Sequence, residues 1–308
     1  METFNTALNC GAFTLPWNAI MLVLGVLVAV IITEILVKKR RLYKDLALDC
    51  CIIALPCGIV GGRLFAALSG RIAWADLVNI THTGMNLPGA LLFAAIGIFI
   101  YCRVKKFRFG AVLDVLMPGA FFGLAVGRWS DFFLCEGLGP VVTDPSLKFF
   151  PLSTFTKAYF TDHETVAYAV FFLDFLVCIA LGITALVLLN RQKRTGLACR
   201  VTIGSYLAAA FVLEWLRDGS ARQLLFGGVR FNQLIWMLML LIFVVYLLFL
   251  SGRKPASDTV DLAAPPAPEP PIEQEPDEPE QPDEPEQPDE SEQPEEPGEP
   301  DEKTEDET

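Results

Sequence analysis

The sequence is poor in the residues that build metal sites. Only two of its 308 residues are histidine, and none of its eight cysteines forms a CxxC pair or a cluster with histidine. A metal centre of the Cys/His type is therefore not expected. Basic residues are also missing from residues 1–16, and Lys303 is the only one in residues 255–308. This second absence divides the chain into regions of different charge.

The chain consists of a basic body and an acidic tail. Residues 255–308 contain 22 Asp and Glu against one Lys, a net charge of −21, whereas residues 1–254 contain 14 acidic and 23 basic residues, a net charge of +9. The whole chain carries −12 although 53% of it is hydrophobic. This combination excludes an ordinary soluble globular enzyme, and the sign of the tail argues against nucleic acid as a partner.

Seven apolar runs are long enough to cross a bilayer as helices, which takes about 20 residues. They are residues 17–37, 46–68, 87–104, 110–132, 166–190, 199–217 and 231–251. Pro56 lies in the second run together with three glycines, so a kink or a break is expected there. The predicted fold class is all-α, a polytopic membrane protein with seven transmembrane helices.

Lysine and arginine cluster after every second span, at residues 38–44, 103–108, 191–200 and 253–254. The other connections are poorer in these residues. With the N-terminus outside and the C-terminus in the cytoplasm, all four clusters lie on the cytoplasmic side, as the positive-inside rule requires. The first span is not a removable signal peptide, because no basic region precedes it and it is too long.

The acidic tail has a composition typical of disordered segments. It contains 14 of the 21 prolines and repeats EPEQPD at residues 278–283 and 284–289. It has no apolar face that could offset the entropy of ordering, so we expect it to be disordered and extended. The predicted domains are a membrane domain over residues 1–254 and this cytoplasmic tail over 255–308. The tail is either a solvating appendage or a tether for an unknown basic partner.

Six of the cysteines lie in or beside the spans, where they are expected to pack as small apolar residues. These are Cys50, Cys51, Cys57, Cys102, Cys178 and Cys199. Cys10 and Cys135 are predicted to face the outside and could pair with each other.

Charged residues within membrane spans are costly and are by default read as functional. Those found here are Arg63, Asp114, Arg128, Asp131, Glu136, Asp174, Glu214 and Arg217. Each has a structural alternative. Arg63 and Arg128 could reach the outer interface, and Glu214 and Arg217 could pair along one helix face. Asp114 could balance nearby basic residues.

Considered together, these charges favour a binding site. Three arginines (Arg63, Arg128 and Arg217) and two glutamates (Glu136 and Glu214) fall in the outer halves of three spans or just beyond them. If those spans pack together, the three guanidiniums suit the phosphate of a lipid headgroup better than a metal or a proton path. Chemistry alone thus predicts a membrane protein that binds an anionic lipid.

The stretch DVLMPGAFFGLAVGRWSDFFLCEGLG, residues 114–139, resembles the signature of the bacterial prolipoprotein diacylglyceryl transferases. The matching positions are Asp114, Pro118, Gly123, Gly127, Arg128, Phe132, Glu136 and Gly139. VGGRL at 60–64 is similar to a second family motif, and residues 194–219 are similar to a third, which includes Tyr206, Glu214 and Arg217. The resemblance extends over about residues 15–250 and excludes the tail.

This resemblance implies a seven-span enzyme of the bacterial plasma membrane. It would transfer the diacylglyceryl group of phosphatidylglycerol to the lipobox cysteine of a prolipoprotein, whose signal peptide it would bind. No metal or organic cofactor is implied. The expected catalytic residues are Arg128, which would hold the phosphate of the leaving glycerol phosphate, and Glu136. The expected substrate-binding residues are Arg63, Asp131, Gly139, Glu214 and Arg217.

The sequence also departs from the family pattern. A family histidine, often proposed as the general base, aligns with Pro88, and a family arginine aligns with Ala210. At two positions where the family signature has asparagine, this chain has Asp131 and Leu134. The negative charge of Asp131 should weaken anion binding unless this carboxylate is paired or protonated. His82 could replace the histidine only after a loop rearrangement.

Three hypotheses therefore stay open. The first is an active transferase with a relaxed site. The second is a catalytically impaired member that binds anionic phospholipid or lipoprotein precursors without turnover. The third is a scaffold whose working part is the tail. A transporter is less favoured, because no duplicated half is visible.

Overall fold

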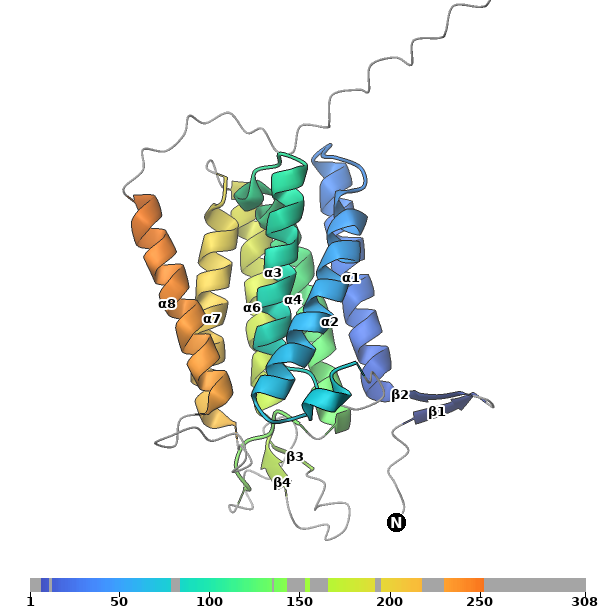
Figure 1. The fold of residues 1–308 in the computed structure, drawn as a ribbon. Coiled ribbons are helices and arrows are strands. Elements are labelled where there is room, and N and C mark those ends of the chain that lie inside the picture. Colours follow the sequence, from blue (N-terminus) through green and yellow to red (C-terminus); the bar gives the residue numbers. More distant parts are fainter. Residues whose placement is uncertain are drawn as a thin grey trace, which may run out of the picture. The chain divides into compact units, whose positions relative to one another are not determined.

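The fold is that of a computed structural model, which describes residues 7–10, 13–78, 84–134, 136–142, 153–155, 166–191, 195–217 and 230–251. Seven helices of this part are long and apolar enough to cross a membrane (Figure 1). They are α1 (Trp17–Lys39), α2 (Leu46–Leu68), α3 (Leu87–Val104), α4 (Phe109–Leu134), α6 (Val170–Arg191), α7 (Leu197–Leu216) and α8 (Phe231–Ser251). The prediction of seven spans is confirmed.

The predicted fifth span began four residues too early. Val166–Tyr168 forms a short strand, β4, which pairs antiparallel with β3 (Ser153–Phe155). The backbone of Tyr168 also bonds with the segment after α4, donating to the Pro140 carbonyl and accepting from the Gly139 amide. These bonds hold residues 166–168 extended, so the helix starts only at Val170. An apolar run alone does not distinguish a buried strand from the first turn of a helix.

Further short elements flank the helices. Strands β1 (Ala7–Cys10) and β2 (Phe13–Pro16) form an antiparallel hairpin directly before α1, and the 3-10 helix η1 (Trp74–Asp76) follows α2. Pro56 lies inside α2, which continues through it, so the expected break is absent.

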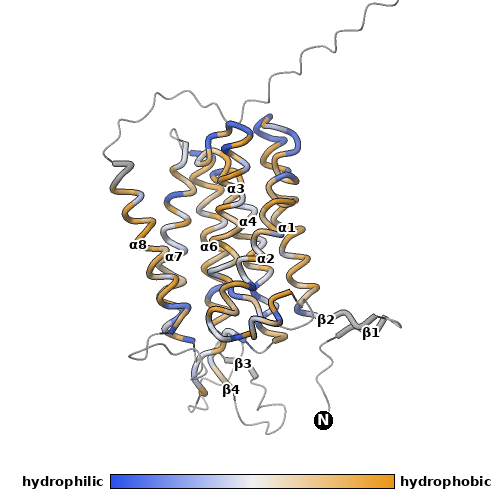
Figure 2. Tube along the Cα trace, in the orientation of Figure 1, coloured by the Kyte–Doolittle hydropathy of each residue, from blue (hydrophilic) through white to orange (hydrophobic). Residues whose placement is uncertain are grey.

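The helices alternate in direction, which sorts the connections between them. We define the outer end of the bundle as the end where α2, α4 and α7 finish and α3, α6 and α8 begin. The turns after α1, α3 and α6 lie at the opposite, inner end, and Figure 2 shows hydrophilic residues at the first two of these turns. Three of the four basic clusters thus share one end, as the predicted topology requires.

Glycines bring α1 into direct backbone contact with α4, the most buried of the seven helices. A Cβ atom on Gly25 would lie 2.5 Å from the Gly123 carbonyl oxygen, and one on Gly119 would lie 2.5 Å from the Ala29 carbonyl oxygen. Small residues permit such close approach of helices in membranes. The Gly119–Gly123–Gly127 row is therefore a packing surface for α1.

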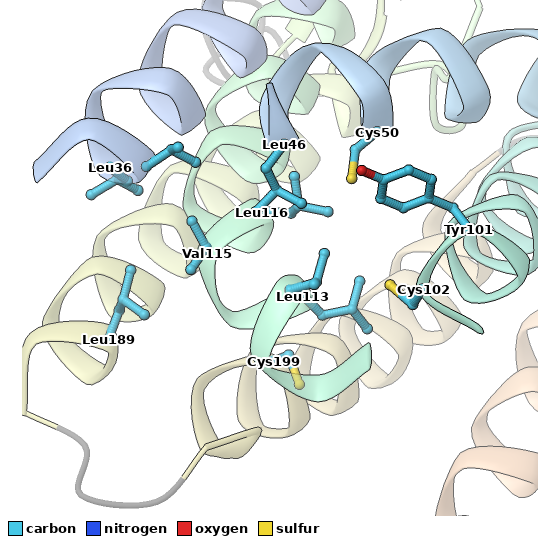
Figure 3. Packing of buried hydrophobic residues seen from close by; sticks show 12 residues of the cluster. Leu36, Leu46, Cys50, Tyr101, Cys102, Leu113, Val115, Leu116, Leu189 and Cys199 are labelled. Atoms are coloured by element: carbon cyan, nitrogen blue, oxygen red, sulfur yellow. The ribbon is translucent and has the colours of Figure 1, made fainter. Parts of the chain in front are cut away.

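The inner half of the bundle holds an apolar core built by α1, α2, α3, α4, α6 and α7 (Figure 3). Cys50, Cys102 and Cys199 lie among its leucines and valines, and the six described cysteines that were expected to pack in the spans are all free thiols. Asp114, fully buried at the edge of this core, accepts hydrogen bonds from the backbone amides of Gly196 (2.5 Å) and Cys199 (2.7 Å). Asp114 thus satisfies the first turn of α7 rather than belonging to a site.

Candidate functional site

Arg128 is the centre of a polar network at the outer end. It lies near the end of α4 with only 6% of its surface exposed. Its guanidinium contacts Asp174 of α6 at 2.5 Å and Asp131, one turn on, at 3.2 Å, and it donates to the hydroxyl of Tyr206 of α7 at 3.0 Å. Its Nε is buried and has no hydrogen-bond partner. Three helices therefore hold one guanidinium and leave one of its donors unused.

Asp174 connects Arg128 to a second arginine. The same carboxylate oxygen, Oδ2, lies 3.0 Å from Arg217, which also pairs with Glu214 at 3.3 Å. Asp174 and Glu214 are buried, and the Nε of Arg217 is another buried donor without a partner. The expected local pair of Glu214 and Arg217 exists, but it is part of a network that spans α4, α6 and α7.

Arg230 closes this network from the start of α8. Its guanidinium donates to the carbonyl of Glu214 at 2.9 Å and to the carbonyl of Arg217. A cation at the C-terminal end of a helix is favourable because the last carbonyls have no partner within the helix. Arg230 thus fixes the end of α7, where Glu214 and Arg217 lie.

Glu136 belongs to a second, more exposed pair. Its carboxylate lies 3.1 Å from Arg71, which follows α2, and Arg71 also donates to the carbonyl of Met85 before α3 at 3.2 Å. The Glu136 side chain is 40% exposed, whereas that of Asp174 is 2% exposed. Arg71 therefore ties together the ends of α2, α3 and α4 around the most exposed carboxylate of the site.

Gly139 connects the segment after α4 to two other elements. A Cβ atom there would lie 2.9 Å from the Leu216 carbonyl oxygen and 3.0 Å from the Cβ of Tyr168. Its amide donates to the Tyr168 carbonyl at 2.8 Å. Any side chain at this position would push apart the end of α7 and strand β4, so Gly139 is needed for close approach.

Arg63 is buried in α2 near the outer end, with 6% of its surface exposed. The neighbouring Gly62 carbonyl accepts a hydrogen bond from the backbone amide of Asn86 at 3.0 Å. The fully buried Asn86 also donates from its side chain to Asn232 of α8 at 2.6 Å. Arg63 is thus placed beside a polar contact between α3 and α8.

The two positions at which this chain lacks a basic residue of the family pattern, Pro88 and Ala210, are both buried. Pro88 is buried in the first turn of α3, and Ala210 lies in an apolar cluster with Phe121, Tyr206 and Trp236. The side chains of proline and alanine can neither transfer a proton nor bind a phosphate. The two histidines, His82 and His163, and the predicted pairing partner Cys135 lie outside the described residues.

The structure brings four of the predicted site residues into one network, namely Arg128, Asp131, Glu214 and Arg217. Four residues that hold the site together were not among the predicted site residues: Asp174, Tyr206, Arg71 and Arg230. For Asp174 a signal existed, because a carboxylate within a span is costly. For Tyr206 the signal was its match to a family motif. Arg71 and Arg230 lie outside the spans, where arginine is common.

Comparison with known proteins gives the same assignment. The family model of prolipoprotein diacylglyceryl transferase matches residues 5–249. A phosphatidylglycerol–prolipoprotein diacylglyceryl transferase 1 of Clostridium perfringens is 30% identical over 253 residues, covering 80% of this chain and 94% of that protein. Enzymes with the corresponding name from Clostridium botulinum (30% over 250 residues) and Clostridium kluyveri (28% over 254) cover 78% and 80% of this chain, and 95% and 96% of their own length.

The family model reaches from before α1 to residue 249 near the end of α8, and it includes every residue of the outer polar network. Together with the seven helices that could cross a membrane, the family match and the bacterial relatives identify this chain as a multi-pass protein of the bacterial plasma membrane. The chain belongs to the prolipoprotein diacylglyceryl transferase family.

Proposed function

We propose that this protein transfers the diacylglyceryl group of phosphatidylglycerol to the lipobox cysteine of prolipoproteins. The observation that carries this proposal is the buried Arg128, held by three helices at the outer end with its Nε donor unused. A buried polar group without a partner calls for an explanation. A phosphate that accepts from Arg128 and Arg217 would supply one, because guanidinium matches the geometry of phosphate oxygens.

The reaction increases negative charge where the arginines lie. The cysteine sulfur forms a bond to the glyceryl carbon, and the bond between that carbon and the phosphate oxygen breaks. A phosphodiester with one charge thereby becomes a phosphomonoester, and the thiol gives up its proton. Donors placed at such developing charge stabilise the transition state more than the bound substrate.

The outer network contains equal numbers of acidic and basic side chains. Asp131, Asp174 and Glu214 are matched in number by Arg128, Arg217 and Arg230, so this network is neutral when all six are ionised. Arg63 is a further guanidinium at the same end, and we assign it to the phosphate site because it lies in the VGGRL stretch that is similar to a family motif.

We assign the acceptance of the thiol proton to Glu136. Its side chain is 40% exposed, compared with 20% for Asp131, 5% for Glu214 and 2% for Asp174, so an incoming peptide reaches Glu136 first. A general base must lie within hydrogen-bond reach of the proton that it takes. Gly139 keeps the segment that carries Glu136 against α7 and β4.

A second candidate function is lipid or precursor binding without turnover. It is favoured by Pro88 and Ala210, since both positions are packed against apolar neighbours instead of offering the family's basic groups. Under this candidate the protein would still bind phosphate but would not catalyse the transfer.

The test is an assay with purified full-length protein, phosphatidylglycerol and a lipobox peptide, in which mass spectrometry detects the diacylglyceryl thioether. We expect product, and we expect Arg128→Gln to lower the rate by about 10²-fold or more, the usual effect of removing a donor to a developing oxyanion. Arg103→Gln is the matched control, because Arg103 lies at the inner end over the Phe99 ring.

Folded protein that binds the lipid but forms no thioether would instead establish the second candidate. A full rate in Arg128→Gln would contradict the proposed role of the buried arginine in the transfer reaction.

A further inference from the structure

Asp174 differs from the other carboxylates of the site in being shared. Its carboxylate contacts two arginines, Arg128 and Arg217, and it does so through a single oxygen, Oδ2. Its other oxygen, Oδ1, faces only the thiol of Cys178 at 3.7 Å, a weak donor. The carboxylate is therefore held almost entirely by the two guanidiniums.

Asp174 and a phosphate would compete for the same donors. Arg128 directs one terminal nitrogen at both Asp174 and Tyr206, and Arg217 directs one at Asp174. The two Nε groups are buried and have no hydrogen-bond partner. A phosphate between the arginines would take over the terminal nitrogens that Asp174 now occupies, and the two Nε groups would be further donors to it. Carboxylate and phosphate are interchangeable partners here, since both offer oxygens to the guanidinium fork.

Product release poses a separate problem. The leaving glycerol phosphate carries more negative charge than the diester from which it forms, so two arginines would hold the product more tightly than the substrate. A carboxylate fixed on the adjacent helix acts at a high effective concentration, unlike any ion from solution. Asp174 has the position and the charge to form its ion pairs with Arg128 and Arg217 again and so to displace the product.

We propose that Asp174 is the positioning residue that exchanges with phosphate during each cycle. It holds Arg128 and Arg217 in the resting site, yields them to the lipid phosphate, and displaces the leaving glycerol phosphate by rebinding both. This proposal rests on the proposed transferase function and goes beyond it, because it assigns product release to a residue outside the predicted site.

The test is Asp174→Asn in the full-length protein, assayed in phosphatidylglycerol nanodiscs with a lipobox peptide. Asparagine keeps the size and removes the charge. We expect added glycerol phosphate to inhibit the variant at a concentration lower by about tenfold, which corresponds to roughly one charge-assisted hydrogen bond. We also expect a fast first turnover followed by a slow steady state. Asp49→Asn is the control, because this carboxylate lies near the inner end and accepts from Tyr101.

Unchanged product inhibition, or a first turnover that slows as much as the steady state, would overturn the proposal and leave Asp174 a purely structural ion-pair partner. These results differ from failure of the proposed function, in which the unsubstituted protein itself forms no thioether.

A second measurement leaves Asp174 itself unsubstituted. Infrared difference spectra of Asp131→Asn, which retains Asp174, would be recorded on addition of glycerol phosphate, with aspartate labelled by carbon-13. We expect a label-sensitive carboxylate band to shift as Asp174 loses its donors. The absence of any label-sensitive change on binding would refute the exchange.

Discussion

At the scale of single residues, Asp131 lies directly beside the arginine of the candidate phosphate site. It occupies a position where the family pattern has asparagine, and its carboxylate pairs with Arg128 at 3.2 Å. A Cβ atom on Gly137 would lie 3.1 Å from the same oxygen, and Gly137 has φ +67°, so this glycine lets the backbone pass close to the carboxylate. Asp131 is thus paired as the sequence required, but it uses part of the capacity of Arg128 for anions.

Asp131→Asn is therefore expected to strengthen lipid binding. Removal of a competing carboxylate leaves the guanidinium edge available, and the gain is about tenfold if it equals one hydrogen bond to a charged group. Binding of phosphatidylglycerol in nanodiscs, measured by native mass spectrometry against a neutral diacylglycerol, would show the difference. Equal affinities would mean that the phosphate does not approach Arg128 from this side.

At the scale of elements, helix contacts decide where the arginines lie. Gly25 and Gly123 bring α1 and α4 together, and α4 in turn contacts α6 and α7, which carry Asp174 and Tyr206. Trp129 adds aromatic contacts to Phe171 and Phe175 of α6, with ring centroids 6.1 and 5.8 Å apart. The network around Arg128 therefore depends on packing along the whole of α4.

Gly123→Ala should destabilise the bundle. The added methyl group would meet the Gly25 carbonyl, which is backbone and cannot turn aside. Overpacking of this kind costs about 1–3 kcal/mol, which lowers the melting temperature by roughly 2–4 °C per kcal/mol. Thermal unfolding in detergent would measure the loss.

Gly127→Ala in the same helix is the control for this comparison. A Cβ atom there would meet only Leu22, at an ordinary 3.8 Å. A loss of stability equal to that of Gly123→Ala would show that the α1–α4 backbone contact is not responsible, because alanine favours a helix more than glycine does.

At the scale of the whole molecule, the function of the acidic tail has to be tested separately from that of the membrane-spanning part. The family match ends at residue 249, and all the residues of the site lie before it. The tail, with its net charge of −21, lies outside both the match and the described residues. Its proposed roles as a solvating appendage or as a tether stay predictions from composition.

Deletion of residues 255–308 is expected to leave the rate of thioether formation within about twofold, because the family match ends at residue 249 and already includes every residue of the site. The same assay with purified protein measures this. A rate that falls with the tail while Arg128→Gln retains full activity would instead favour the scaffold hypothesis.

Local patterns in the sequence were enough to predict the number of spans, the family and the residue types of the site. These properties depend on local patterns: length of apolar runs, side of basic clusters, and a motif read in register. The pairs Arg128–Asp131 and Glu214–Arg217 were equally within its reach, because residues three apart lie on one face of a helix.

How these residues combine depends on contacts between helices, which no local pattern describes. Asp174 is 43 residues from Arg217 in sequence, and Arg71 is 65 residues from Glu136. Which carboxylate meets which guanidinium depends on the rotation and separation of whole helices, set by contacts such as Gly25 on Gly123. The start of α6 followed the same rule, since the amide of Gly139 donates to Tyr168 and the amide of Tyr168 donates to the Pro140 carbonyl, which holds Tyr168 extended. Asp174 contacts Arg128 and Arg217 because segments distant in the sequence pack together, and no local pattern describes that packing.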